Sequence, residues 1–277
     1  MSFIMKKRFT LSFLLLTFVA QAQVIPVGFI KAMGFTNIPT GDSGLTSNLL
    51  LYLDATRTTS YGGTGTTWTD ISGQSNNATL AGSSNPLTSP PAFGSGNLMN
   101  GSGSFTFAAN TNALTSNLIS SLSAATFIAW VNPTETQGSY TGIIYSRAAF
   151  SGATAPATGM NFYTNNSVGY SWNDDGLTYN WESNRRTPLN QWSMIAVSIN
   201  SSTATVYLCN ASGIVSSTNT VTHSALTGLK FYIGVEPSSL TTRAFKGKIA
   251  TAMVYSTALT EVNITAIFNA QKASFGL

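Results

Sequence analysis

The 277-residue sequence contains a single cysteine, Cys209, and a single histidine, His223. One cysteine cannot form a disulfide within the chain, so the fold has to be stabilised by its packed core. Transition-metal sites need clusters of histidine and cysteine side chains, which two isolated residues do not supply. We therefore expect an inert buried thiol at Cys209 and a surface or turn position for His223.

Charged residues are also scarce, at 8% of the chain. The formal net charge of +4 includes Lys6, Lys7 and Arg8. The rest of the chain has ten basic and nine acidic residues, which gives a net charge of +1. Further along the chain Arg185 and Arg186 are adjacent, but one such pair falls far short of a basic stripe that follows phosphates. We expect no nucleic-acid partner.

Long hydrophobic runs are missing apart from residues 9–20, which are mostly apolar. A bilayer span needs about twenty apolar residues, whereas this run has the length of the central part of a signal peptide. The basic residues before it and the small residues Ala20 and Ala22 after it complete that pattern. The sequence predicts cleavage between Ala22 and Gln23 and a secreted, extracellular or cell-surface protein with no membrane span.

Serine, threonine, asparagine and glycine are abundant, and they separate short segments in which apolar residues alternate with polar ones. This period of two is typical of half-buried strands. We predict strands at residues 48–54, 103–108, 125–131, 141–146, 159–163, 229–235 and 247–255, and a short helix or loop at 114–122. One α-helix is expected near the end of the chain, with Thr260 as its N-cap and an apolar side reaching Lys272.

These elements predict an all-β fold, an antiparallel β-sandwich with a short C-terminal α-helix. We expect residues 1–22 to form the signal peptide, residues 23–47 an N-terminal arm or linker, and residues 48–277 the folded domain.

The richest stretch for function is residues 168–209. Tyr170 and Trp172 alternate with small polar residues, residues 173–176 (NDDG) form a turn signal, and Tyr179 and Trp181 alternate on the return. This pattern predicts a β-hairpin. A second hairpin is expected from residues 192–199 and 204–209.

Four segments together resemble the LamG-like, concanavalin A-like lectin/glucanase jelly roll: WTDISG with NNATL in 68–80, TFIAWV at 126–131, QW with ATVYL in 191–208, and FKGKI with VYSTALT in 245–260. The resemblance spans about residues 48–272. It implies one convex and one concave sheet, with ligands on the concave face or its rim, often together with calcium. Fold does not by itself establish function.

Glycoside hydrolysis needs two facing carboxylates, and no pair of acidic residues at strand spacing is present. Carbohydrate binding needs less: an aromatic ring for the C–H face of a sugar, with amides and carboxylates for its hydroxyls. The first hairpin offers that mixture in the candidate ligand-binding residues Tyr170, Trp172, Asn173, Asp174, Tyr179 and Trp181. The alternative is that the four aromatic residues are cross-strand pairs of the core.

We identify no certain cofactor. The oxygen-bearing side chains of this chain suit calcium among the common ions. The candidates are scattered and have no EF-hand spacing, so we assign no metal ligand among Asp54, Asp70, Asn76, Asn77, Asp174 and Asp175.

The sequence predicts a secreted, non-catalytic module that binds a polysaccharide or cell-surface glycan. One alternative is a structural subunit of an extracellular appendage, surface layer or virion-like assembly, which self-associates through the apolar arm at residues 24–35. A third is a glycan-degrading enzyme, a glycanase or lyase.

Overall fold

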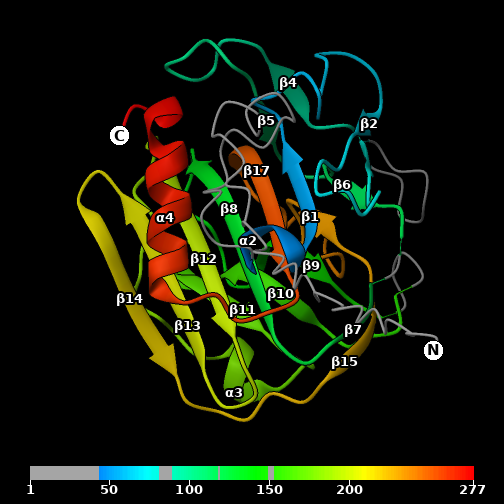
Figure 1. The fold of residues 1–277 in the computed structure, drawn as a ribbon, viewed down its shortest axis with the longest axis vertical. Helices are drawn as coiled ribbons and strands as arrows, with labels where there is room; N and C mark the ends of the chain where they lie inside the picture. The colour runs from blue at the N-terminus through cyan, green and yellow to red at the C-terminus, as the bar shows by residue number, and fades with distance from the viewer. Residues whose placement is uncertain (1–43, 81–88, 118, 149–152) are drawn as a thin grey trace, which may run out of the picture.

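The computed structural model describes residues 44–80, 89–117, 119–148 and 153–277. Most of this chain is arranged in two antiparallel sheets (Figure 1). The predicted signal peptide and residues 23–43 of the predicted arm lie outside the described residues. None of the helices in the described part has the length and apolarity needed to cross a bilayer.

The larger sheet has eight strands. Seven of them follow one another across the sheet in the order β14 (Gly213–Asn219), β13 (Ala204–Asn210), β12 (Ser193–Ile199), β8 (Ala125–Pro133), β17 (Gly247–Tyr255), β5 (Ser104–Phe107) and β4 (Ala92–Gly94). The eighth strand, β1 (Leu49–Asp54), also pairs with β17.

The smaller sheet has seven strands, in the order β11 (Val168–Ser171), β10 (Thr158–Phe162), β9 (Thr141–Ser146), β16 (Tyr232–Ile233), β6 (Ala113–Thr115), β3 (Ala78–Leu80) and β2 (Thr67–Trp68). A separate ribbon pairs β7 (Ile119–Leu122) with β15 (Leu226–Leu229). The helices are α2 (Gly44–Ser47), α3 (Gly176–Tyr179) and α4 (Glu261–Gln271), with 3₁₀ turns at Thr164–Asn166 and Lys272–Phe275.

The main core lies between the two sheets. Phe127 of β8 meets Phe231 with ring centroids 5.7 Å apart, and Phe162 of β10 stacks on Phe245 at 5.9 Å. All four rings are fully buried. Each buried side chain of this size contributes about 1.5–3 kcal/mol, so the fold is stabilised without any disulfide.

Helix α4 covers the outer face of the larger sheet and forms a second core there (Figure 1). Ile128 and Trp130 of β8 point into this second core, whereas their neighbours Phe127 and Ala129 point into the main one. The Trp130 ring stacks on the Phe275 ring, with the two ring centroids 3.8 Å apart. The outer face of the smaller sheet carries polar side chains, among them those of Tyr145, Asn161 and Ser171.

Several sequence predictions are confirmed. The second hairpin exists as β12 and β13, and the strands predicted at 125–131, 141–146 and 247–255 are β8, β9 and β17. Helix α4 begins after the expected N-cap, because the Thr260 hydroxyl accepts a hydrogen bond from the Asn263 amide. Cys209 is buried, as expected.

Other predictions were wrong. Residues 114–122 contain parts of the strands β6 and β7, with neither a helix nor a continuous loop. The first hairpin does not form: β11 ends at Ser171, and the chain then enters the one-turn helix α3. The Asp175 carboxylate caps this helix by accepting from the Leu177 amide, a side-chain contact that competes with the turn of a hairpin.

Candidate functional site

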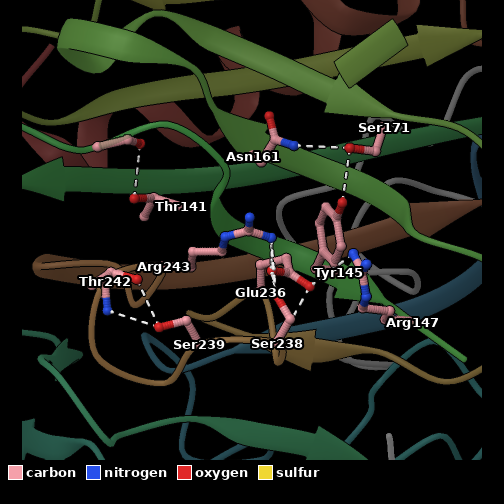
Figure 2. Close-up of polar contacts among 11 residues, drawn as sticks. Thr141, Tyr145, Arg147, Asn161, Ser171, Glu236, Ser238, Ser239, Thr242 and Arg243 are labelled. Carbon is pink, nitrogen blue, oxygen red and sulfur yellow. Dashed lines mark hydrogen bonds and ion pairs between the residues drawn. The ribbon is translucent and has the colours of Figure 1, made fainter. Parts of the chain in front are cut away.

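Three neighbouring strands place polar side chains on the outer face of the smaller sheet. Tyr145 of β9 and Ser171 of β11 both pair with Gly159 of β10, so the three residues form one row across the sheet. Gly159 has no side chain, and the Tyr145 hydroxyl donates across it to Ser171 Oγ at 2.8 Å. Asn161 Nδ2 donates to the same Oγ at 3.2 Å, which fixes the serine (Figure 2).

Beside this row, the Glu236 carboxylate lies between two arginines (Figure 2). Arg147 Nη1 lies 3.3 Å from Oε1, and Arg243 Nη1 lies 2.5 Å from Oε2. The Ser238 amide donates to Oε1 and the Ser238 hydroxyl donates to Oε2. Glu236 is fully buried, whereas the side chains of Arg147 and Arg243 are 28% and 31% exposed. The carboxylate is therefore a fixed anchor that holds both guanidinium groups at the surface.

Two further tyrosines stand next to the arginines. The guanidinium carbon of Arg243 lies 4.9 Å from the Tyr140 ring centroid, a cation–π contact. The Tyr140 and Tyr179 rings meet edge to face at 5.9 Å, and the Tyr140 hydroxyl donates to Asn180 Oδ1 at 3.0 Å. Both rings are half-buried, so part of each remains accessible to a ligand.

These side chains surround a surface pocket of about 300 Å³, here called the tyrosine–arginine pocket. It is lined by Tyr140, Tyr145, Arg147, Ser171, Asp174, Tyr179 and Arg243. The lining combines aromatic rings, cationic N–H donors, hydroxyl groups and one carboxylate, and it draws on segments more than a hundred residues apart.

Burial raises the pKa of the Tyr145 hydroxyl above its ordinary value, and desolvation raises that of Tyr140 as well. Nearby negative charge, including that of Glu236, also raises the pKa of Tyr145. Both hydroxyls are therefore protonated at neutral pH and act as hydrogen-bond donors, with no capacity to serve as bases there.

The structure divides the predicted ligand-binding residues. Asp174 and Tyr179 line the pocket, and the exposed Asn173 donates to Ser224 Oγ at 3.3 Å. Tyr170 and Trp172 are 0% and 1% exposed and belong to the main core. They cannot form the predicted ligand platform. Alternate residues of β11 face opposite sides of the sheet and Tyr170 is on the inner side, and Trp172, the residue after β11, packs into the same core.

Trp181 is also a packing residue. It is partly buried against the main core, and its ring meets that of Tyr170 edge to face at 6.1 Å. The packing alternative therefore describes Tyr170, Trp172 and Trp181. The sequence did not identify Tyr140, Arg147 or Arg243 as site residues. The alternation of residues in β9 could have placed Tyr145 on one face of the sheet, but no local pattern connects β9 to Arg243.

His223 is buried, which corrects the expectation of a surface or turn histidine. Asn219 Nδ2 donates to the Tyr170 hydroxyl at 3.0 Å, and the same hydroxyl shares a hydrogen bond of 3.0 Å with His223 Nε2. A neutral imidazole fits this contact in either tautomer, with Nε2 as acceptor or as donor. Burial lowers the pKa of His223, which favours the same neutral form.

Two of the calcium candidates are occupied by hydrogen bonds from the protein. Asp54 accepts from the Tyr52 hydroxyl and the Thr56 amide, and Asp70 accepts from the amides of Tyr52 and Asn76. Within the described residues, no three histidine, cysteine, aspartate or glutamate side chains gather as ligands for a metal ion. Asp54 and Asp70 therefore serve to hold the segment between β1 and β3.

Comparison with known protein families gives one match. The model of the concanavalin A-like lectin/glucanases superfamily matches residues 100–265, which is more than half of the chain. No curated protein matches at the level of sequence.

Solved structures resemble the fold at low sequence identity. Domain 4 of AbnA, a GH43 extracellular arabinanase from Geobacillus stearothermophilus in complex with arabinotriose, has a TM-score of 0.56 and 17% identity, covering 79% of this chain and 98% of that chain. A GH54 α-L-arabinofuranosidase has a TM-score of 0.56 and 11% identity, covering 76% of this chain and 51% of that one. At these identities the likeness concerns the fold.

A sialidase from Trypanosoma rangeli, in complex with 2,3-difluorosialic acid, has a TM-score of 0.54 and 13% identity, covering 88% of this chain. The present chain spans 38% of the sialidase chain and about half of the arabinofuranosidase chain, so it corresponds to a part of each enzyme.

Proposed function

The chain belongs to the concanavalin A-like lectin/glucanase superfamily, and on that premise we propose that it is a non-catalytic module that binds a glycan in the tyrosine–arginine pocket. The observation that carries the proposal is the grouping of Tyr140 and Tyr179 with Arg243 around a recess of about 300 Å³. Small-molecule sites typically combine aromatic walls with a few convergent polar groups.

Each part of the pocket has a counterpart in a sugar. The exposed parts of the Tyr140 and Tyr179 rings offer flat amphipathic surfaces for the C–H face of a pyranose or furanose. Asp174 can accept hydrogen bonds from sugar hydroxyls, and the arginine N–H groups can donate to them. Among the structural neighbours, AbnA domain 4 was solved with arabinotriose and the sialidase with 2,3-difluorosialic acid, which supports a glycan as the ligand class.

The state of the carboxylates supports binding without cleavage. Glycoside hydrolysis needs one carboxyl group as a proton donor and a second as nucleophile or base. Glu236 is buried and tied to two guanidinium groups, so it is held as an ion pair. Asp174 is then the carboxylate of the pocket lining that a ligand can reach, and one carboxylate does not make a hydrolytic pair.

The test is affinity electrophoresis and calorimetry of the full chain against arabinan, xylan, laminarin, polygalacturonate and sialylated glycans. Tyr140→Ala and Tyr179→Ala are each expected to weaken binding at least tenfold, about 1.4 kcal/mol. Leu177→Ala is the matched control, because this residue is 67% exposed on the same helix as Tyr179 and lies outside the pocket lining.

Absence of binding across the panel, or tyrosine variants that bind like the wild type, would overturn the proposal. A reducing-sugar assay on the same polymers separates binding from cleavage. Release of sugar that Asp174→Asn abolishes would identify a hydrolase instead.

We also propose that the protein acts outside the cell, because the basic and apolar N-terminal sequence has the pattern of a cleaved leader. N-terminal sequencing of protein recovered from the medium or cell surface should begin at Gln23. A start at Met1 would contradict export by this route.

A further inference from the structure

The hydrogen bonds around Glu236 leave the tyrosine–arginine pocket rich in donors. A carboxylate has about four acceptor sites, and Glu236 uses its two oxygens for four donors: Arg147, Arg243, and the amide and hydroxyl of Ser238. It is fully buried and thus offers no acceptor to a ligand.

Each guanidinium group keeps most of its capacity. An arginine has five N–H donors in a planar fork. Both Arg147 and Arg243 contact Glu236 through Nη1, and Arg243 Nη1 also donates to Ser238 Oγ at 2.9 Å, so Nε and Nη2 remain available on each. Both side chains are about 30% exposed, and both line the pocket. The group of two guanidiniums and one carboxylate has a net charge of +1, directed to the exposed side because the negative member is the buried one.

The other polar groups leave the pocket rich in hydrogen-bond donors and positively charged at Arg147 and Arg243. The Tyr145 hydroxyl is protonated and already donates to Ser171, so it adds no negative charge. Asp174 is the negative group of the lining, and it is exposed, where water screens its charge. A ligand that fits has to bring acceptors, and preferably a negative charge, to Arg147 and Arg243.

We infer that the tyrosine–arginine pocket selects glycans that carry an anionic group, either the carboxylate of a uronic or sialic acid or a sulfate ester. This inference rests on the proposed function and adds a ligand class to it. Planar guanidinium groups match the two oxygens of such anions, and charge-assisted hydrogen bonds of this kind are roughly twice as strong as neutral ones. Tyr140 supports the geometry by holding the Arg243 group against its ring.

The first experiment compares matched polymers on the wild-type full chain. Polygalacturonate is paired with its carboxyl-reduced form, and κ-carrageenan with unsulfated agarose. We expect at least tenfold tighter binding to the anionic member of one pair, and this advantage should shrink between 50 and 500 mM NaCl because salt screens charge interactions. The two pairs distinguish a carboxylate from a sulfate ester.

The second experiment uses variants of the arginines. Arg243→Gln and Arg147→Gln should each remove most of the preference for the anionic polymer, and Arg243→Lys should retain part of it because the charge stays while the planar fork is lost. Arg186→Gln is the control: its partner Glu182 is also partly exposed, and neither lines the pocket. Thermal unfolding identifies any variant that fails to fold, and the wild-type comparison does not depend on variants.

The outcomes separate the two proposals. Equal affinity for both members of each pair, with binding still lost in Tyr140→Ala, overturns the anionic preference and leaves glycan binding intact. An anionic preference that Arg186→Gln reduces as much as Arg243→Gln does would show a diffuse charge effect and overturn the inference. No binding to any polymer overturns the proposed function itself.

Discussion

The hydroxyl oxygen of Tyr145 lies 2.8 Å from Ser171 Oγ although a complete strand separates the two residues. The contact is made over Gly159, the residue of β10 that pairs with both of them. Gly159 has a φ of 141°, and a Cβ at this position would lie 2.1 Å from the carbonyl oxygen of Ile144. The floor of the tyrosine–arginine pocket therefore depends on a residue that has no side chain.

Gly159→Ala is expected to lower the free energy of unfolding by about 3 kcal/mol, because strained backbone and a clash with main-chain atoms add together. Gly62→Ala is the matched control, since nothing lies within 4 Å of the Cβ it would gain. Urea denaturation followed by tryptophan fluorescence measures both. Equal stability of the two variants would show that β10 can shift to make room.

The buried ion pair should matter more than an exposed one. Arg243→Gln leaves the buried Glu236 with one arginine and is expected to cost about 2–3 kcal/mol. Lys246→Gln breaks the pair with Glu135, whose side chains are 43% and 63% exposed, and should change stability by less than about 1 kcal/mol. Chemical denaturation of both variants checks the order, and similar costs would contradict it.

His223 should make stability depend on pH in a defined direction. Its pKa is lowered in the folded state by burial, so the unfolded chain binds a proton first as the pH falls. The contribution of the neutral imidazole is complete above its unfolded pKa of about 6.5 and is lost progressively as the pH drops from there to the lower folded pKa. The slope cannot exceed about 1.4 kcal/mol per pH unit.

The measurement is the free energy of unfolding between pH 7.5 and 5. His223→Gln provides the control, because the glutamine amide can still hydrogen-bond to the Tyr170 hydroxyl but does not titrate. The slope in this window should disappear in the variant. A slope that persists would have to come from another group.

The helical layer on the larger sheet can be tested at Phe275. This residue is 5% exposed, and its ring stacks on Trp130 at 3.8 Å. Phe275→Ala should cost about 3–5 kcal/mol, because a large buried ring leaves a cavity. Val262→Ala, at a residue of α4 that is 77% exposed, should be neutral within about 0.5 kcal/mol. Equal melting temperatures for the two variants would show that the C-terminal layer adds little.

Local sequence signals predicted much of the sandwich. The short apolar segments at residues 125–131 and 247–255 predicted β8 and β17, and those on either side of residues 200–203 predicted the hairpin of β12 and β13. Both faces of β8 and β17 are buried, so these strands have few polar positions. The N-cap at Thr260 predicted the start of α4 because capping depends on residues three apart. The hairpin that was predicted but does not form shows the limit of local signals. The same four residues, 173–176, can form a hairpin turn or lead into a helix capped by Asp175, and the sequence pattern does not distinguish the two.

The composition, the isolated Cys209 and the alternating segments determined by themselves that this chain forms a disulfide-free antiparallel sandwich with a helix at its end, because those signals act between residues close in sequence. Tertiary structure alone decided which aromatic residues face inward and which charged groups meet. Tyr170 and Tyr179 have similar sequence surroundings, yet one lies in the core and the other beside Arg243. Their difference comes from sheet register and from contacts between residues more than sixty positions apart, which no local pattern encodes.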